Sequence, residues 1–321
     1  MAFGAESISL LTDERMLAHG APGHPERPER LAAVADGVAN AATALGVELV
    51  RPTVEPAPDA LIELVHPQWF VRALEAVAQR GGGWVDGDTY VGPQSMLASR
   101  LAAGATHDAA LAAVRGESRV AFAVVRPPGH HAAEERSAGF CILNNVAIAA
   151  AGLRAAGLAQ RIAIVDWDVH HGDGTQAIFD ADPDLCYAST HESPFYPGTG
   201  AAAERGSGPA IGTKHNVPLA AGSGDPQFTA AWLQELLPAV EAFAPEAILV
   251  SAGYDAHRDD PLAWLEVTDD GYRAVAREIG AMAQRLGIHG VALTLEGGYD
   301  PAALRASAAA TVEGLWKGLL G

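Results

Sequence analysis

The sequence has few cysteines, and this shortage excludes two kinds of site. Only two of its 321 residues are cysteine, Cys141 and Cys186, and they do not form a CxxC pair. A zinc site built from neighbouring thiolates and a thioredoxin-like redox motif are therefore both excluded. Because both cysteines lie in apolar stretches, we expect them to be buried and reduced.

Positive charge is also scarce. The chain has 21 Lys and Arg against 39 Asp and Glu, which gives a formal net charge of -18 at pH 7. It lacks the basic footprint with which proteins neutralise nucleic-acid phosphates, so we predict no nucleic-acid partner. An acidic surface attracts a cationic ligand or a basic peptide, and it also serves simply to keep a protein in solution.

No apolar stretch approaches the ~20 residues that a membrane-spanning helix needs. The N-terminal segment MAFGAESISLLTDERML has no basic start followed by a long apolar run, so it does not resemble a signal peptide. These absences predict a cytoplasmic protein with no membrane partner. They leave its oligomeric state open.

Short apolar runs rich in Val and Ile alternate with longer stretches rich in Ala and Leu, without repeats or long linkers. The predicted strands are Ser7–Leu11, Val120–Val125, Arg161–Val165, Leu185–Ser189, Ala247–Ser251 and Val291–Leu295. The predicted helices are Glu29–Leu45, Ser95–Val114, Asn144–Ala156, Pro226–Phe243, Asp269–Leu286 and Pro301–Leu319. This alternation indicates an α/β fold, a single domain over residues 1–321 with a mostly parallel sheet covered on both faces.

Polar sequences directly follow four of these apolar runs. They are RPPGHH, DWDVHHGDG, YDAH and EGGYD. Ligands of open α/β sheets bind beyond the carboxyl ends of the strands. We therefore expect these histidines, aspartates and tyrosines to meet at one edge of the sheet.

A metal site is the chemistry that the DWDVHHGDG segment favours. Asp168 and His170 are two residues apart, so their side chains point to the same side of an extended chain. Asp255, after another strand, is the best candidate for a third ligand. Three protein ligands and an open position are typical of catalytic zinc, which lowers the pKa of its water to about 7. Iron(II) or cobalt would also suit these ligands, and Asp and Gly after a strand can instead form only a turn and a helix cap.

Two further elements offer acid-base chemistry near such a site. Two prolines and a glycine precede His130 and His131, and adjacent imidazoles can act as a general base and its electrostatic partner. Asp166 and Asp173 are carboxylates that could hold their second ring nitrogens. Tyr299 follows two glycines, and a phenol near a polarised carbonyl can stabilise a developing oxyanion.

The segments above resemble the histone deacetylase superfamily, especially its class II-like and bacterial amidohydrolase members. The matching segments, in order, are HPERPERL, VDGDT, RPPGHHA, GFCILNN, DWDVHHGDGTQ, FYPGTG, NVPL, GYDAHRDDPL and EGGY. The resemblance implies the arginase/deacetylase fold, with a central, mainly parallel eight-stranded sheet. It also implies a catalytic zinc ion on Asp168, His170 and Asp255, and Tyr299 as the group that polarises the substrate carbonyl.

The same resemblance assigns the two histidines. His131, held by Asp173, is implied to be the general base and acid. His130, paired with Asp166, is implied to be the electrostatic partner. A structural potassium ion is also implied, with the candidate ligands Asp166, Asp168, His170, Ser189 and Thr190.

Substrate-binding residues follow from the resemblance as well. Phe140 and Tyr196 resemble the aromatic walls of an acyl-lysine tunnel, with Gly139 leaving room beside Phe140. Asp88 resembles a rim acid that accepts hydrogen bonds from substrate amides, although a solvated loop acid is also compatible with the sequence. Arg30 resembles a residue near the acetate exit path, or is an ordinary arginine on a helix surface.

Three departures from relatives bear on specificity. Tyr196 stands where many relatives have Phe. Leu262 stands where polyamine-specialised relatives have an acidic gatekeeper. The Ser251–Asp255 segment offers a single acid, so a binuclear ureohydrolase is disfavoured.

These features predict a zinc-dependent enzyme that hydrolyses the acetyl-amide of a lysine-like side chain and releases acetate. An acetylpolyamine or other small-molecule amidohydrolase is the main alternative. A catalytically silent module that binds acyl-lysine is a third, and metal analysis with an acetyl-lysine assay separates it from the first two.

Overall fold

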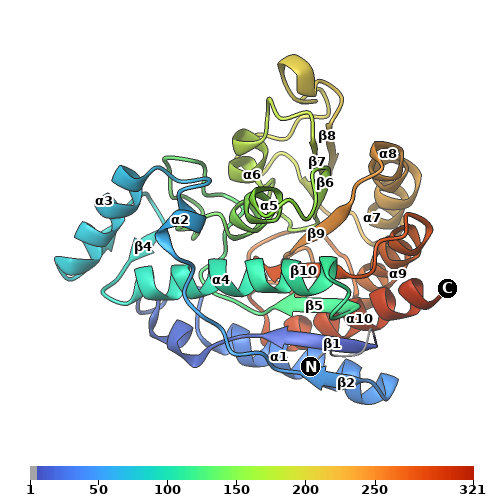
Figure 1. Cartoon of the computed structure of the whole chain (residues 1–321), viewed down its shortest axis with the longest axis horizontal. Coiled ribbons are helices and arrows are strands. Elements are labelled where there is room, and N and C mark those ends of the chain that lie inside the picture. Colours follow the sequence, from blue (N-terminus) through green and yellow to red (C-terminus); the bar gives the residue numbers. More distant parts are fainter. Residues whose placement is uncertain (1–5) are drawn as a thin grey trace.

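Eight strands form one sheet in which every neighbouring pair is parallel, in the order β2-β1-β5-β10-β9-β6-β7-β8. The computed structural model describes residues 6–321 (Figure 1). The strands of this sheet are β1 (Ser7–Leu11), β2 (Glu48–Val50), β5 (Val120–Ala123), β6 (Ile162–Asp166), β7 (Leu185–Glu192), β8 (Lys214–Leu219), β9 (Ala247–Ala252) and β10 (Val291–Leu295). A separate two-stranded hairpin pairs β3 (Gly83–Trp84) with β4 (Tyr90–Val91).

The six strands predicted from apolar runs are all present, and they are the six inner strands of the sheet. The two strands that the sequence did not predict, β2 and β8, are its edges. An edge strand is half exposed, so its sequence need not be a continuous apolar run. The β8 sequence KHNVPL also contains Pro218, which is tolerated at an edge because one side of that strand needs no hydrogen-bond donor.

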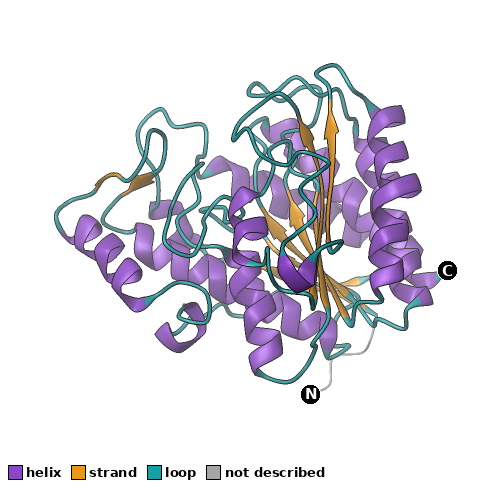
Figure 2. Ribbon diagram, turned by 90° about the horizontal axis from the view of Figure 1, so that it is seen from above, coloured by secondary structure: helices purple, strands orange, loops and turns teal. Residues whose placement is uncertain are grey.

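Helices cover both faces of the sheet (Figure 2). On one face α4 packs on β1, β5, β10 and α5, while α1, α9 and α10 pack together on the other (Figure 1). The helices are α1 (Glu29–Leu45), α2 (Asp59–Ile62), α3 (Gln68–Gln79), α4 (Ser95–Val114), α5 (Asn145–Ala155), α6 (Asp173–Ile178), α7 (Asp225–Ala230), α8 (Leu237–Phe243), α9 (Asp269–Arg285) and α10 (Pro301–Leu320). The predictions for α1 and α4 match to the residue, and those for α5, α9 and α10 match within one residue at each end.

The predicted single helix Pro226–Phe243 is wrong in one respect. It is interrupted by a π-helical turn at Ala231–Leu236, between α7 and α8. The Leu237 amide donates to the carbonyl of Trp232, five residues earlier. Pro238 follows directly and has no amide hydrogen to continue the α-helical pattern, which favours a wider turn at this point.

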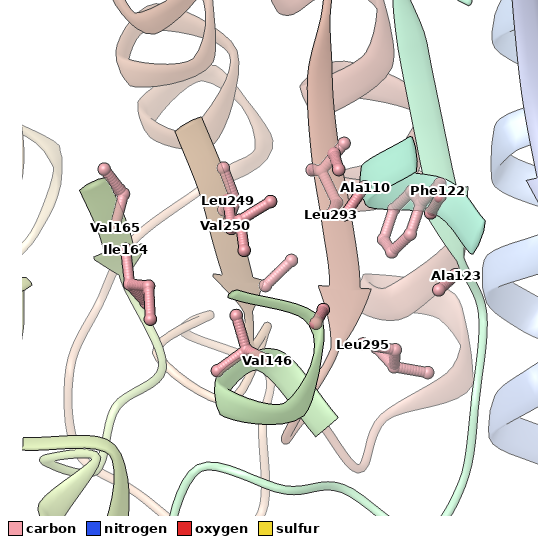
Figure 3. Packing of buried hydrophobic residues seen from close by; sticks show 14 of the residues in the cluster. Ala110, Phe122, Ala123, Val146, Ile164, Val165, Leu249, Val250, Leu293 and Leu295 are labelled. Carbon is pink, nitrogen blue, oxygen red and sulfur yellow. The ribbon is translucent and has the colours of Figure 1, made fainter. Parts of the chain in front are cut away.

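The interior of the sheet is apolar and fully buried. Phe122 of β5, Leu293 of β10, Val250 of β9 and Val165 of β6 are register neighbours on adjacent strands, and Val146 of α5 belongs to the same buried cluster (Figure 3). Cys141 and Cys186 are buried free thiols, as expected. Among the described residues, no helix combines the length and apolar character needed to cross a bilayer.

The order of the strands places the predicted site. RPPGHH follows β5, EGGYD follows β10, YDAH follows β9 and DWDVHHGDG begins at the end of β6. These four strands are consecutive neighbours in the sheet. Because they are parallel, their carboxyl ends lie at the same edge, and the four polar segments meet there.

Candidate active site

A cavity of about 240 Å³ opens at this edge of the sheet. Its walls bring together residues that are far apart in the sequence, and all of them except Pro128 and Gly297 were predicted as site residues. The lining residues are Asp88, Pro128, His130, His131, Gly139, Phe140, Asp168, His170, Tyr196, Leu262, Gly297 and Tyr299. Asp166, Asp173 and Asp255 do not line the cavity but contact residues that do.

Asp168, His170 and Asp255 converge on one point at the cavity floor. Their ligand atoms lie within 4.8 Å of one another. Nδ1 of His170 is 3.0 Å from Oδ1 of Asp168 and 3.3 Å from Oδ2 of Asp255. Burial opposes a charge on His170, but the two neighbouring carboxylates raise its pKa to about 10. The carboxylates therefore create a strongly negative potential that favours a cation.

The surroundings of these donors fit a small divalent cation. Oδ2 of Asp255 is buried and makes no hydrogen bond within the described chain. Gly297 passes so close that an added Cβ would lie 2.0 Å from that oxygen and 2.6 Å from Oδ2 of Asp168. A buried carboxylate oxygen without a donor is costly unless a cation compensates it. The set of two oxygens and one nitrogen suits zinc.

A second group of potential metal ligands joins His130, Cys141 and Glu296. Burial, with a contribution from Glu296, raises the pKa of the Cys141 thiol well above its ordinary value. Both carboxylate oxygens of Glu296 already accept hydrogen bonds, from the Gly129 and His130 amides and from the Ser251 hydroxyl, whereas Oδ2 of Asp255 accepts none within the described chain. The described structure therefore favours the Asp168 group as the metal site.

The paired histidines are each held by a different carboxylate. Nδ1 of His130 lies 3.1 Å from Oδ2 of Asp166, which also accepts a hydrogen bond from the Tyr187 hydroxyl. Nδ1 of His131 lies 2.7 Å from Oδ1 of Asp173. Because a carboxylate only accepts, both Nδ1 atoms carry hydrogen, and a neutral ring then has an unprotonated Nε2.

The two imidazoles nevertheless titrate in opposite directions. Burial disfavours the charge on His130, but Asp168 and Asp166 outweigh it and raise the pKa of His130 well above its usual value. Burial, followed by the charge of His130, lowers the pKa of His131 to about 3. The ring centroids are only 4.1 Å apart. Neighbouring groups whose pKa values are driven apart can divide the roles of base and electrostatic partner.

Tyr299 presents its phenol to the same cavity. Burial and the charge of Asp255 raise the pKa of Tyr299 well above its ordinary value. The phenol therefore remains protonated and available as a hydrogen-bond donor. Its ring lies edge-on to Phe140, with centroids 5.9 Å apart, and the guanidinium carbon of Arg30 is 5.1 Å from its centroid.

The chain reverses at Gly139 and Phe140, which have φ angles of 56° and 70°. The Phe140 amide donates to Oγ1 of Thr89 at 3.0 Å, which fixes this turn against the β3–β4 hairpin. The space left by Gly139 serves a different neighbour from the predicted one. An added Cβ at Gly139 would lie 2.4 Å from Cδ2 of His131.

The Gly139→Ala variant should lose activity because the new methyl group displaces His131. We expect kcat to fall about tenfold or more, because small misplacements of a reacting group are costly. The matched control is Gly157→Ala, which has a similar φ of 67° and nothing within 4 Å of an added Cβ. Both variants carry the backbone strain, and only Gly139→Ala should change kcat. Equal kcat values in steady-state kinetics would contradict this.

The mouth of the cavity combines an acid with aromatic and aliphatic side chains. Burial, with a contribution from Asp86, raises the pKa of Asp88. Tyr196 is 41% exposed, and its ring stands edge-on to His131 with centroids 5.1 Å apart. The cavity is thus polar at its floor, while Phe140, Tyr196 and Leu262 contribute apolar surface to its walls.

The similarity of this chain to known proteins identifies its family. The protein-family model described as "Histone deacetylase domain" matches residues 24–315. Histone deacetylase 15 of Arabidopsis thaliana is 41% identical over 316 residues, and the match spans 96% of this chain but only 56% of that protein. The histone deacetylase-like amidohydrolase of Pseudomonas aeruginosa is 34% identical over 318 residues, which span 98% of this chain and 82% of that protein. The chain belongs to the histone deacetylase family.

Solved structures agree with this family and with the predicted fold. The crystal structure of the HDA15 HD domain matches with a TM-score of 0.88 at 39% identity, over 98% of this chain and 89% of that one. Acetylpolyamine aminohydrolase from Burkholderia pseudomallei matches with a TM-score of 0.86 at 31% identity, over 96% and 98% of the two chains. Like its relatives, this histone deacetylase family member is a deacetylase or amidohydrolase, and therefore a hydrolase.

Sequence reasoning missed the buried charges that support the site of this deacetylase family member. Arg126 donates to both carboxylate oxygens of Glu26, and Arg30 donates to Glu26 and to the carbonyls of Glu296 and Gly298. Arg30 is fully buried, so it is not the surface arginine that the sequence allowed. The only sequence signal is that Glu26 and Arg30 are four residues apart, just before and within α1.

Glu296 is a second missed residue. Its Oε2 accepts hydrogen bonds from the amides of Gly129 and His130, at 2.7 Å and 3.1 Å. Burial raises the pKa of Glu296 to about 7. The glutamate ties the paired-histidine loop after β5 to the tyrosine loop after β10, and no spacing in the sequence shows this.

Replacing Glu26 by Gln should strongly destabilise this deacetylase family member. The change leaves two buried guanidinium groups without a carboxylate, and breaking a buried ion pair costs about 3–5 kcal/mol. The free energy of unfolding from urea titration is the measurement. Glu29→Gln is the control, since Glu29 is 68% exposed and should change stability by less than about 0.5 kcal/mol. Equal effects of the two substitutions would exclude a stabilising role for the buried cluster.

Proposed function

We propose that the chain, as a single deacetylase domain over residues 1–321, is a zinc-dependent amidohydrolase that removes acetyl groups from lysine-like side chains and releases acetate. One observation carries this proposal. A cluster of metal donors, two imidazoles held by separate carboxylates, and a phenol lie together at one cavity, which Asp168, His170, His130, His131 and Tyr299 line and Asp255 supports from behind.

Zinc would be held by Asp168, His170 and Asp255, where it would polarise an amide carbonyl and lower the pKa of a water molecule. His131 is positioned to take a proton from the attacking water, since its Nδ1 hydrogen is directed to Asp173 and its Nε2 is free. Tyr299 donates a hydrogen bond to the carbonyl oxygen as negative charge develops on it. His131 then returns the proton to the leaving amine while His130 supplies a positive charge nearby.

The walls of the cavity support a lysine-like substrate. Phe140, Tyr196 and Leu262 offer apolar surface to a methylene stem, and Asp88 stands at the rim, where substrate amides could donate to it. Acetylated lysine in a peptide is therefore the preferred substrate class. Acetylpolyamines remain the second candidate, because the match to an acetylpolyamine aminohydrolase covers nearly the whole chain.

We also propose a structural potassium ion near Asp166, Asp168, His170, Ser189 and Thr190. Nε2 of His191 lies 2.8 Å from the carbonyl of Gly200, so that nitrogen carries the hydrogen. Nδ1 of His191 must then accept from the Ser189 hydroxyl, 3.0 Å away, which leaves the serine lone pairs free for a cation. Ser189 lies opposite Asp166 in the β6–β7 register.

A substrate panel tests the proposed function. Acetyl-lysine peptides, longer acyl-lysines and acetylated polyamines should be compared at equal concentration, with and without chelator. We expect hydrolysis of acetyl-lysine that requires the metal, and a fall in kcat of about 10²-fold in Tyr299→Phe, because one oxyanion donor is lost. A chain that binds zinc but hydrolyses none of these amides would instead support a silent acyl-lysine-binding module.

A further inference from the structure

Asp260 is a buried carboxylate that joins two walls of the active-site cavity. It is only 7% exposed and lies in the loop between β9 and α9. Its Oδ2 accepts a hydrogen bond of 2.6 Å from the backbone amide of Tyr299. Its Oδ1 accepts one of 2.9 Å from the amide of Leu262. Tyr299 and Leu262 both line the cavity, yet they follow different strands.

The rest of the loop after β10 is held by other groups. The Gly297 amide donates to Oδ2 of Asp168 at 2.7 Å, and Nε of Arg30 donates to the Gly298 carbonyl at 2.5 Å. The contact with Asp260 is the one that acts on the backbone amide of Tyr299 itself. The phenol lies at the far end of this side chain, so a small rotation at the backbone displaces its hydroxyl by a large fraction of a hydrogen-bond length.

We propose that Asp260 is a positioning residue that fixes Tyr299 and, through Leu262, the width of the cavity beside the phenol. This inference rests on the proposed function, because it concerns the role of Tyr299 in that reaction. Asp260 does not touch the reacting atoms. It acts by holding the donor of the oxyanion hydrogen bond at the distance that transition-state stabilisation requires.

Both carboxylate oxygens of Asp260 are needed as acceptors, which makes asparagine a sharp probe. An asparagine has nearly the same shape, but it offers one acceptor oxygen and one NH2 donor group. Its NH2 group would therefore face one of the two backbone N–H groups, and two donors cannot form a hydrogen bond. The Asp260→Asn variant should therefore release either Tyr299 or Leu262 with little change in volume. Asp259→Asn is the matched control, since the neighbouring Asp259 carries the same charge and is 65% exposed.

The test combines kinetics with a measurement that does not depend on activity. In Asp260→Asn we expect kcat to fall about 10- to 100-fold, while the zinc content per chain stays unchanged. Hydrogen exchange should become about tenfold faster at the Tyr299 amide or at the Leu262 amide, whichever loses its acceptor. Asp259→Asn should match the wild type in every measurement.

A double-mutant cycle separates positioning from a general structural effect. If Asp260 acts through the phenol, Asp260→Asn should cost little further activity in a Tyr299→Phe background. If the falls in kcat caused by the two substitutions multiply in the double mutant, or if kcat is unchanged in Asp260→Asn, the inference is overturned. Failure of the proposed function is distinguishable from failure of this inference, because the wild type would then hydrolyse none of the amides. If Asp260→Asn unfolds, Asp260→Glu displaces the same carboxylate by one methylene and is judged by the same cycle.

Discussion

Stripping the divalent cation should abolish hydrolysis, and zinc should restore it. Polarising the carbonyl and supplying hydroxide near neutral pH together contribute several kcal/mol, so we expect a loss of about 10³-fold or more. Asp168 and Asp255 are both buried, and Nδ1 of His170 lies 3.0 Å and 3.3 Å from their oxygens, so removing the cation leaves two buried carboxylates beside one imidazole. Dialysis against chelator, elemental analysis and an acetyl-lysine assay on the same sample are the measurements.

The Asp255→Asn variant gives the same prediction without a chelator. An amide is a weaker ligand than a carboxylate, so metal content and kcat should fall together. Asp259→Asn removes an exposed carboxylate four residues away and should retain both. Full activity in a sample shown to contain no metal would exclude a metalloenzyme. Reconstitution with iron(II) or cobalt as well as zinc would show which metals the site accepts.

Replacing His131 by alanine should have the second-largest effect. A positioned general base contributes about 10²- to 10⁴-fold, and we expect kcat to fall by that amount while zinc content stays the same. His131 is placed for this role because its Nδ1 hydrogen is directed to Asp173, which leaves Nε2 free to accept a proton, and because burial and the charge of His130 lower its pKa. It therefore remains an unprotonated base throughout the neutral range.

His130→Ala gives the comparison that distinguishes the two histidines. His130 lacks the lowered pKa and is held cationic by Asp168 and Asp166, so it should contribute electrostatic stabilisation only. Its loss should lower kcat less than the loss of His131 does. Removing the charge of His130 should also raise the pKa of His131, so the acid limb of the pH-rate profile should move to higher pH. A larger loss in His130→Ala than in His131→Ala would reverse the assignment.

The inner part of the fold could be predicted from the sequence because buried parallel strands must be apolar along their length. Val120–Val125 and Ala247–Ser251 show this pattern, and β5 and β9 lie where it predicts. The edge strand β2 is part-exposed, so its three residues carry no comparable signal. The π-helical turn before Pro238 depends on one missing hydrogen bond, which a periodic apolar pattern does not reveal.

The site residues also fall into those that the sequence predicts and those that it does not. Asp168 and His170 are two residues apart, and that spacing indicated a shared ligand, although residues 168–170 form a bend rather than the expected extended segment, with the His170 amide donating to Oδ1 of Asp168. Glu296 and Asp260 accept hydrogen bonds from backbone amides of distant loops. Nearly every residue type has a backbone amide, so the sequence gives no signal for such a partner. Their role became visible only when the loops after β5, β9 and β10 were seen together.

The order of strands in the sheet also sets when the site can form during synthesis. β10 is the last strand made, yet it lies between β5 and β9 rather than at an edge. Until residues 291–295 have left the ribosome, the loop with His130 and His131 and the loop with Asp255 are separated by a gap one strand wide. The metal donors Asp168, His170 and Asp255 follow the adjacent strands β6 and β9, so they can meet before β10 is made, whereas the paired histidines can join them only once β10 fills the gap.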